Sequence, residues 1–120
     1  SEVSLHLSQL AQILLQAIYD LSWNDLVAQY GEPKCVINDQ VMTPGMGIIA
    51  YGKLGGYELH YQSDLDIIFL HNSAGSQQQT TGSRVIDNAT FFSRLAQKII
   101  SKITLLTAAG STGGAEARTP

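Results

Sequence analysis

Apolar residues recur every three or four positions near the start of the chain, which is the spacing of one face of an amphipathic helix. This helix is predicted from Val3 to about Tyr30. Its apolar stripe comprises Leu7, Leu10, Leu14, Ala17, Ile18 and Leu21. We expect a bend near Ser22–Trp23. Gly31 and Pro33 should end the helix, because glycine often follows the last helical residue and proline cannot continue the helix.

A second amphipathic helix is predicted toward the other end of the chain. Asp87 or Asn88 can cap its first turn, and the apolar spacing continues to about Leu106. The stripe of this helix is Phe92, Leu95, Ile99, Ile103 and Leu106, with Arg94, Lys98 and Lys102 on its wetter side. The remaining residues, 107–120, are small, polar and rich in glycine, so the pattern assigns them no structure.

Two short apolar runs between the helices predict strands. The first is Gly47–Tyr51, and the second, Leu65–Leu70, is rich in Ile and Phe, which indicates a buried strand. Between them, Tyr57–Tyr61 could form one or two helical turns. The fold class predicted from this order is α+β, a small mixed sheet with the Leu65–Leu70 strand at its centre and covering helices.

The segments that flank these runs are predicted to be loops. Residues 34–46 contain several turn-forming residues, with room for a short strand at Cys35–Ile37. Asn72–Gly82 is polar, contains three consecutive glutamines, and predicts a surface loop.

Composition narrows the possible functions. A chain of 120 residues with 44% hydrophobic and 14% charged residues suits one globular domain. The net charge of −3 provides no diffuse basic surface, so we expect no nucleic-acid partner. The single cysteine, Cys35, excludes an internal disulfide and fits a reducing compartment. No apolar run spans a bilayer and no signal-peptide pattern is present, so we expect a cytoplasmic protein without a membrane partner.

The residues with the clearest chemical potential are Asp64 and Asp66, which flank Leu65 at the start of the second apolar run. Strand side chains alternate between faces, so the two carboxylates should share one face, about 7 Å apart, while Leu65 points to the core. Their repulsion would be relieved by a divalent cation, and Mg²⁺ prefers such oxygen ligands. A solvated strand start is the alternative interpretation of this pair alone.

A glycine-rich turn follows the first apolar run directly. Gly52, Gly55 and Gly56 leave room for phosphate oxygens to approach backbone N–H groups, and Lys53 could add a positive charge. Taken alone, the same glycines could simply form a tight turn.

The combined string GMGIIAYGKLGGYELHYQSDLDIIFLH, from Gly45 to His71, closely resembles the signature of the glutamate–ammonia-ligase adenylyltransferase family. This family has a polymerase-beta-like nucleotidyltransferase core. Further similarity is found in Trp23–Pro33 and in the helix Asp87–Leu106, so the resemblance covers residues 20–110. It implies a single, partial nucleotidyltransferase domain over residues 1–120. Within this domain, 1–33 is a leading helical segment, 45–110 the catalytic core and 111–120 a tail of unassigned structure.

The resemblance also implies a reaction. Family members are long chains with two related domains, of which one transfers AMP from ATP to a tyrosine of glutamine synthetase and the other removes it by phosphorolysis. Tyr51, His71 and the Trp23–Pro33 segment look more like the adenylylating, carboxy-terminal half. The implied partners are glutamine synthetase, ATP and a PII-type signalling protein acting through the full-length enzyme. The deadenylylating domain and a non-catalytic fragment of the same fold remain alternatives.

The resemblance assigns roles to individual residues. Asp64 and Asp66 would be the catalytic carboxylates and Mg²⁺ ligands. The nucleotide phosphates would be held by Gly52, Lys53, Gly55, Gly56 and Ser63. The family's third carboxylate lies on a later strand, and counting from Gly110 puts Glu116 at that position. The surrounding GGAEARTP lacks the apolar residues of a strand, so Glu116 is a weaker candidate for the third metal ligand.

Overall fold

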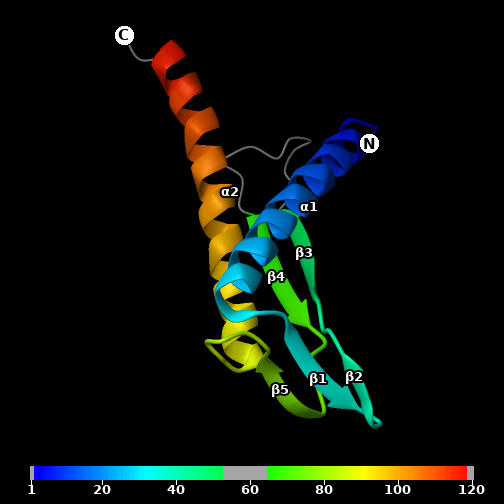
Figure 1. Ribbon diagram of the computed structural model, residues 1–120. Helices are drawn as coiled ribbons and strands as arrows, with labels where there is room; N and C mark the ends of the chain where they lie inside the picture. The colour runs from blue at the N-terminus through cyan, green and yellow to red at the C-terminus, as the bar shows by residue number, and fades with distance from the viewer. Residues whose placement is uncertain (1, 53–64, 119–120) are drawn as a thin grey trace.

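Two long helices and five short strands make up the residues that the computed structural model describes, 2–52 and 65–118. Helix α1 (Glu2–Tyr30) packs against helix α2 (Asn88–Arg118). Figure 1 shows the strands beside this helix pair, with both chain ends at the end of the molecule away from β5. The predicted α+β class is confirmed.

The strands form two antiparallel sheets. In the first, β1 (Pro33–Ile37) lies between β2 (Gln40–Met42) and β5 (Ser76–Thr80). In the second, β3 (Met46–Gly52) pairs with β4 (Leu65–His71). Within the described residues β4 has only β3 as its neighbour, whereas the sequence predicted a central strand in one mixed sheet. Antiparallel neighbours need no crossover connection, and β4 pairs antiparallel with β3 from Leu65 to His71.

The loop predicted for residues 34–46 is instead mostly a hairpin. Ile37 pairs with Gln40, so Asn38 and Asp39 form a two-residue turn, and both have positive φ angles of 52° and 64°. Two consecutive left-handed residues match the twist of a hairpin, and Asn and Asp tolerate that conformation better than most residues. The turn residues were recognised in the sequence, but the pairing of β2 with β1 was not.

The predicted loop Asn72–Gly82 also contains a strand, β5. Its polar side chains are exposed up to Gln79, and only Thr80 is buried, so no apolar pattern marks it. Backbone pairing with β1 forms it, with a register shift opposite Lys34–Val36. Gly75 precedes the strand with φ of 80°, and a Cβ there would overlap the backbone of Val36. Glycine is therefore required for the approach to β1.

The core lies between the two helices. Leu26 and Tyr30 of α1 pack with Phe91 and Leu95 of α2, and Phe91 and Leu95 are fully buried. The Trp23 ring meets the Phe91 ring edge-on, with centroids 5.3 Å apart. Burial of each large apolar side chain contributes about 1.5–3 kcal/mol, so these contacts dominate the stability of the helix pair.

Helix α1 differs from its prediction in two ways. It runs without interruption through Ser22–Trp23, because Ser22 is buried and Trp23 packs on the core. Of the predicted stripe, Ile18 is buried, but three leucines are half or more exposed: Leu10, Leu14 and Leu21. A second apolar face of α1 packs on the core that it shares with α2. It is formed by Tyr19, Trp23, Leu26 and Tyr30.

Helix α2 is longer than predicted. Of its predicted stripe, Phe92, Leu95 and Ile99 are buried and Ile103 packs against the core, but Leu106 is 55% exposed. The helix continues beyond Leu106 to Arg118. The glycine-rich composition of 107–120 hid this extension, since glycine costs about 1 kcal/mol in a helix interior. Figure 1 shows the last turns of α2 projecting past the strands. Over its described residues, neither helix has a stretch long and apolar enough to cross a bilayer.

Candidate active site

The glycine-rich motif begins, and the Asp-x-Asp motif ends, at the same end of the β3–β4 sheet. In the register of this sheet Gly52 lies opposite Leu65, and Tyr51 lies opposite Asp66. Neighbouring strands are separated by about 4.8 Å. The last residue of β3, where the glycine-rich segment begins, is therefore next to the first residues of β4, where the Asp-x-Asp segment ends.

Only part of the predicted site falls within the described residues. Gly52 ends β3, and Asp66 is the second residue of β4. Five candidates lie outside the described residues: Lys53, Gly55, Gly56, Ser63 and Asp64. Tyr57–Tyr61, predicted as a helical turn, also lies outside them. The predicted common face of Asp64 and Asp66 stays a prediction.

The alternation of the β3–β4 sheet separates two sets of positions. Met46, Ile48 and Phe69 belong to the inner set and pack against the core. Ile49 and Ile68, which lie opposite each other, belong to the outer set and are 49% and 41% exposed. The predicted buried strand is therefore buried on one face only. By strand alternation, position 66 belongs to the same set as Ile68 and position 65 to the same set as Ile67. The predicted core-facing orientation of Leu65 stays a prediction.

Glu116 lies in α2, so the tail that carries it is helical where the sequence analysis assigned no structure. The strand that carries the third carboxylate in the family has no counterpart at residues 110–118 of this chain. The proposed metal role of Glu116 stays a prediction. Among the residues that the structure describes, no group of three or more His, Cys, Asp or Glu side chains could hold a metal ion.

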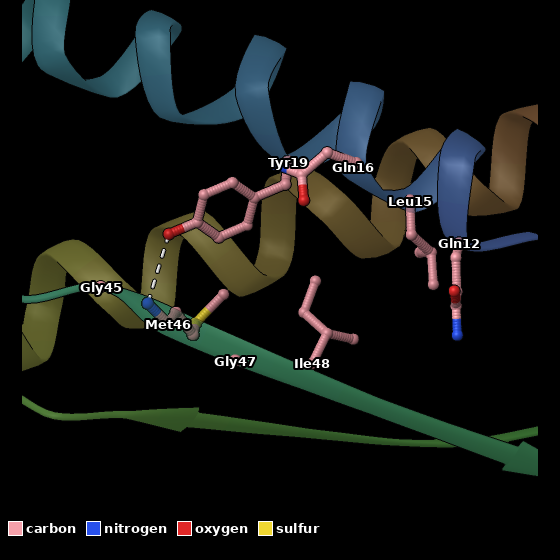
Figure 2. Close-up of a pocket in the computed structure, with 8 residues that line it drawn as sticks. All are labelled: Gln12, Leu15, Gln16, Tyr19, Gly45, Met46, Gly47 and Ile48. Atoms are coloured by element: carbon pink, nitrogen blue, oxygen red, sulfur yellow. Dashed lines mark hydrogen bonds between the residues drawn. The ribbon is translucent and has the colours of Figure 1, made fainter.

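A cleft of about 530 Å³ lies between α1 and β3, on the inner side of the strand (Figure 2). Tyr19 and Gln16 line it from the helix, and Met46 and Ile48 line it from the strand. The Tyr19 phenolic oxygen accepts a hydrogen bond of 3.2 Å from the Met46 N–H. Burial raises the pKa of Tyr19, which the Met46 hydrogen bond partly offsets and nearby Asp20 reinforces.

Among the residues that the structure describes, none with a charged side chain lines this cleft, and this described lining suits a neutral group better than a triphosphate. The apolar spacing of α1 predicts core residues only and gives no sign of this cleft. The available signal was Gln12, Gln16 and Tyr19 at spacings of four and three, which place polar groups along one helix face.

The other end of the β3–β4 sheet, at Met46 and His71, contacts α2 and is held by hydrogen bonds between the segments that flank the two strands. The His71 ring stacks on Phe92 with centroids 4.9 Å apart, and its Nδ1 accepts from the Ser73 N–H at 3.2 Å. Asn72 and Gly45 exchange two hydrogen bonds, of 3.2 Å and 2.9 Å. In this structure His71 thus connects the strand end to α2 and to the segment that follows β4.

Asn88 is a second residue whose role the sequence did not reveal. It was predicted as a possible helix cap, but it is fully buried, and its Nδ2 donates to the Lys34 carbonyl and the Ser73 hydroxyl, both at 2.8 Å. The cap is Asp87, whose carboxylate accepts from the Thr90 N–H at 2.7 Å. That hydrogen bond, together with one from the Thr90 side chain, lowers the pKa of Asp87.

The α+β architecture, with the glycine-rich strand end beside the Asp66 position, is consistent with a nucleotidyltransferase-like fold. The family described as glutamate-ammonia ligase adenylyltransferase matches residues 1–113, and the chain belongs to this family. Three relatives bear the name bifunctional glutamine synthetase adenylyltransferase/adenylyl-removing enzyme. They come from Thioalkalivibrio sulfidiphilus, Haemophilus ducreyi and Mannheimia succiniciproducens, with 49%, 44% and 43% identity over 109 residues.

These matches cover 91% of this chain but only 11% of each relative. The chain thus corresponds to about one ninth of the length of the curated relatives that it matches.

Proposed function

We propose that this chain is part of a Mg²⁺-dependent enzyme that transfers AMP from ATP to a tyrosine of glutamine synthetase. The observation that carries the proposal is the pairing of Gly52 with Leu65 and of Tyr51 with Asp66. It brings Gly52, the first residue of the glycine-rich motif, and Asp66, the last residue of the acidic motif, to one end of one sheet. Family membership and the names of the relatives support the same reaction.

The proposed site uses backbone and carboxylate groups in separate roles. Backbone N–H groups of Gly52–Gly56 would bind phosphate oxygens, aided by the Ser63 hydroxyl and the Lys53 charge. Asp64 and Asp66 would hold Mg²⁺, because carboxylates one residue apart on a strand would share one face and supply oxygen ligands. The bound ion would neutralise phosphate charge and lower the pKa of the attacking hydroxyl. The residues themselves mainly orient the phosphates in line with the tyrosine.

Glu116 is the weaker candidate among the proposed metal ligands. In a helix that projects past the strands, it would reach the site only if the surrounding protein brought it there. Replacement by glutamine should therefore reduce activity much less than replacement of Asp66. Equal losses for Glu116→Gln and Asp66→Asn would support a full ligand role.

The longer protein is proposed to work in the cytoplasm, with a PII-type signalling protein as regulator. ATP and glutamine synthetase are its proposed substrates.

The test is a graft in which this chain replaces the matching 109 residues of the Thioalkalivibrio sulfidiphilus relative. Purified graft, glutamine synthetase, labelled ATP and Mg²⁺ should yield labelled glutamine synthetase. Asp64→Asn and Asp66→Asn should each slow the transfer by about a hundredfold or more, equivalent to about 2.7 kcal/mol of barrier. Asp39→Asn, in the β1–β2 turn, is the matched control and should retain activity. Activity unaffected by the two aspartate variants would refute the assigned site.

Two alternatives are separated by the same graft. The deadenylylating domain would convert adenylylated glutamine synthetase and inorganic phosphate to unmodified glutamine synthetase and ADP, and the two aspartate variants would impair that direction selectively. A non-catalytic segment would show no aspartate-dependent change in either direction and no binding of Mg-nucleotide in a titration.

A further inference from the structure

Two exposed arginines, Arg84 and Arg94, contact the ring of Tyr30 at the end of α1. Their guanidinium carbons lie 5.5 Å and 5.4 Å from the centroid of this ring. An N–H group of Arg94 also donates a hydrogen bond to the Tyr30 phenolic oxygen. Tyr30 is only 5% exposed, so it gives both side chains a fixed support. The cation–π contacts and the hydrogen bond therefore hold two positive charges close together at the surface.

The loop that carries Arg84 is closed at both ends. The Thr80 N–H donates to the Ile86 carbonyl, and the Ile86 N–H donates to the Thr80 hydroxyl, both at 2.9 Å. Between these residues, the Gly82 N–H donates to the Tyr30 carbonyl at 2.8 Å. The backbone beside Arg84 is thus fixed relative to the ring that its side chain contacts. Groups held in place in this way lose less conformational entropy when they bind a partner.

Neither of these arginines forms an ion pair within the described residues, whereas each described lysine does. Lys34 pairs with Glu32 at 3.2 Å. Lys98 and Lys102 share one carboxylate, that of Asp25, at 4.0 Å and 3.6 Å. The whole chain has a net charge of −3, so carboxylates are in excess over basic side chains. Two adjacent arginines without a carboxylate partner are therefore the exception in this structure.

The positive charge continues along α2. Arg94, Lys98 and Lys102 follow one another at intervals of four, which places them about 6 Å apart on one face of the helix. Together with Arg84 they form what we call the basic row. Asp25 supplies the carboxylate that pairs with two of its cations, so the row keeps a net positive charge.

The chemistry of the basic row favours a partner that carries carboxylates. Guanidinium groups form charge-assisted hydrogen bonds with carboxylates, and Arg94 uses only part of its donor set on Tyr30. Acidic side chains on successive turns of a helix, or at alternate positions of an extended segment, are about 6–7 Å apart and match this spacing. A nucleic acid or an anionic membrane would be repelled at longer range by the net negative charge of the chain.

We propose that the basic row docks an acidic segment of a separate polypeptide, with Arg84 and Arg94 as its main contacts. Clusters of arginine are a general means of recognising acidic motifs in proteins. The proposal goes beyond AMP transfer and does not depend on it, because docking is measured by binding alone.

The test measures fluorescence anisotropy of a labelled peptide of alternating Ser and Glu, mixed with the purified chain at low salt. We expect a Kd of about 0.1 mM or lower, and no binding of the matching peptide of alternating Ser and Gln. Arg84→Gln combined with Arg94→Gln should weaken binding by about tenfold or more. Lys34→Gln is the matched control, because its charge belongs to a separate ion pair, and it should change the Kd by less than about twofold. Absence of binding, or binding that the double variant leaves unchanged, would overturn the proposal.

A second measurement covers a double variant that does not fold, which circular dichroism detects. It uses nuclear magnetic resonance of the unaltered, ¹⁵N-labelled chain. Addition of the acidic peptide should shift the side-chain Nε–H signals of Arg84 and Arg94, since these groups would donate to its carboxylates. Shifts confined to other residues would place the peptide elsewhere and overturn the proposal.

The remaining outcomes identify other occupants, and each would reject a separate acidic polypeptide. Tighter binding of oligothymidylate or of phosphatidylserine vesicles, lost in the double variant, would assign the basic row to a nucleic acid or a membrane. Displacement of the peptide by inorganic phosphate below about 1 mM would assign it to a free oxyanion. Loss of peptide binding in the graft described above would assign it to a segment of the longer enzyme. A graft that binds the peptide but transfers no AMP would retain the docking and reject the proposed function.

Discussion

The phenolic oxygen of Tyr19 accepts a hydrogen bond from the backbone N–H of Met46, and this contact joins the middle of α1 to the first residue of β3. The tyrosine thus provides an acceptor for a partly buried backbone donor at the start of β3. Figure 2 shows the ring reaching across one end of the cleft. The bond thus sets the spacing between the helix and the β3–β4 sheet.

Replacement of Tyr19 by Phe keeps the ring and removes the acceptor. We expect the free energy of unfolding to fall by about 0.5–1.5 kcal/mol, the usual cost of such a bond. Urea denaturation followed by circular dichroism measures it. Gln29→Ala, at an exposed position of the same helix, should change stability by less. A Tyr19→Phe variant as stable as the parent would show that the contact contributes nothing.

The same tyrosine should give a pH dependence. Its folded pKa is raised by burial, so the folded state holds the phenolic proton more tightly than the unfolded state above about pH 10. The associated stability is complete below that pH and is lost as pH rises through the folded pKa. The parent should therefore lose more stability than Tyr19→Phe between about pH 9 and 12. Parallel curves for the two proteins would contradict this assignment.

Asp87 should give the opposite pH dependence. Hydrogen bonds from Thr90 lower its folded pKa, so its contribution is present above the unfolded pKa, near 3.8, and is lost as pH falls through the folded value. Asp87→Asn keeps a capping oxygen but does not titrate. Thermal unfolding between about pH 5 and 2 should show a smaller loss of Tm for Asp87→Asn than for the parent. An identical fall in Tm for the two proteins would show that Asp87 does not contribute to the loss of stability at acid pH.

Asn88 connects the start of α2 to β1 and to the segment after β4. Asn88→Ala removes both donors and leaves the Lys34 carbonyl and the Ser73 hydroxyl without them. The expected cost is about 2 kcal/mol or more, because the amide is fully buried. Asn24→Ala, at an exposed position of α1, is the comparison and should cost less than about 0.5 kcal/mol. Similar unfolding midpoints for the two variants would disprove the bridging role.

The isolated chain should transfer AMP to glutamine synthetase far more slowly than the graft. Two carboxylates can hold one divalent ion, whereas a two-metal displacement normally requires a further acid, and Glu116 lies in a projecting helix. Labelled ATP and glutamine synthetase provide the assay for both proteins. Rates within threefold of each other would show that the 120 residues contain the complete site.

The sequence predicted the elements whose apolar pattern is regular. The β3 and β4 runs and the buried face of α2 were correctly placed because each has a period that matches its structure. It did not predict β5, since Ser76–Thr80 has no apolar alternation and pairs with β1 through its backbone. Nor could it decide which side of α1 would meet α2, because both sides are apolar and only the position of Phe91 and Leu95 determines the choice.

The candidate site was likewise predictable only in part. The GKLGG and SDLD strings specify the chemistry and the family, but not the register that places Gly52 beside the Asp66 strand, which depends on backbone pairing. Asn88 illustrates the limit further. An asparagine at a helix start predicts a cap, and only the arrival of Lys34 and Ser73 from distant parts of the chain gives it a different role.

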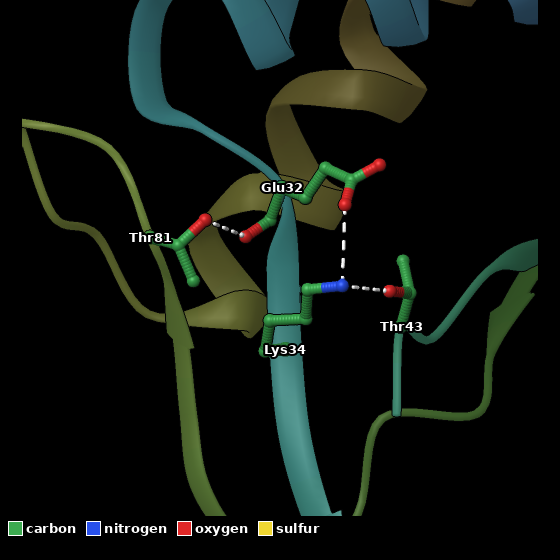
Figure 3. Close-up of polar contacts among 4 residues, drawn as sticks. All are labelled: Glu32, Lys34, Thr43 and Thr81. Atoms are coloured by element: carbon green, nitrogen blue, oxygen red, sulfur yellow. Dashed lines mark hydrogen bonds and ion pairs between the residues drawn. The ribbon is translucent and has the colours of Figure 1, made fainter. Parts of the chain in front are cut away.

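The end of α1 and the approach to α2 are joined by backbone contacts, and this joint has a mechanical consequence. Gly82 N–H donates to the Tyr30 carbonyl at 2.8 Å, and Thr81 N–H donates to the Glu32 carbonyl at 3.1 Å. Figure 3 shows the Thr81 hydroxyl reaching the same Glu32 carbonyl, beside the Lys34–Glu32 ion pair. A Cβ on Gly31 would overlap the Gly82 backbone, so the two segments meet without intervening side chains. Backbone contacts of this kind cannot adjust by changes of side-chain rotamer. A displacement of α1 would therefore be transmitted to β1 and α2 instead of being absorbed at the turn.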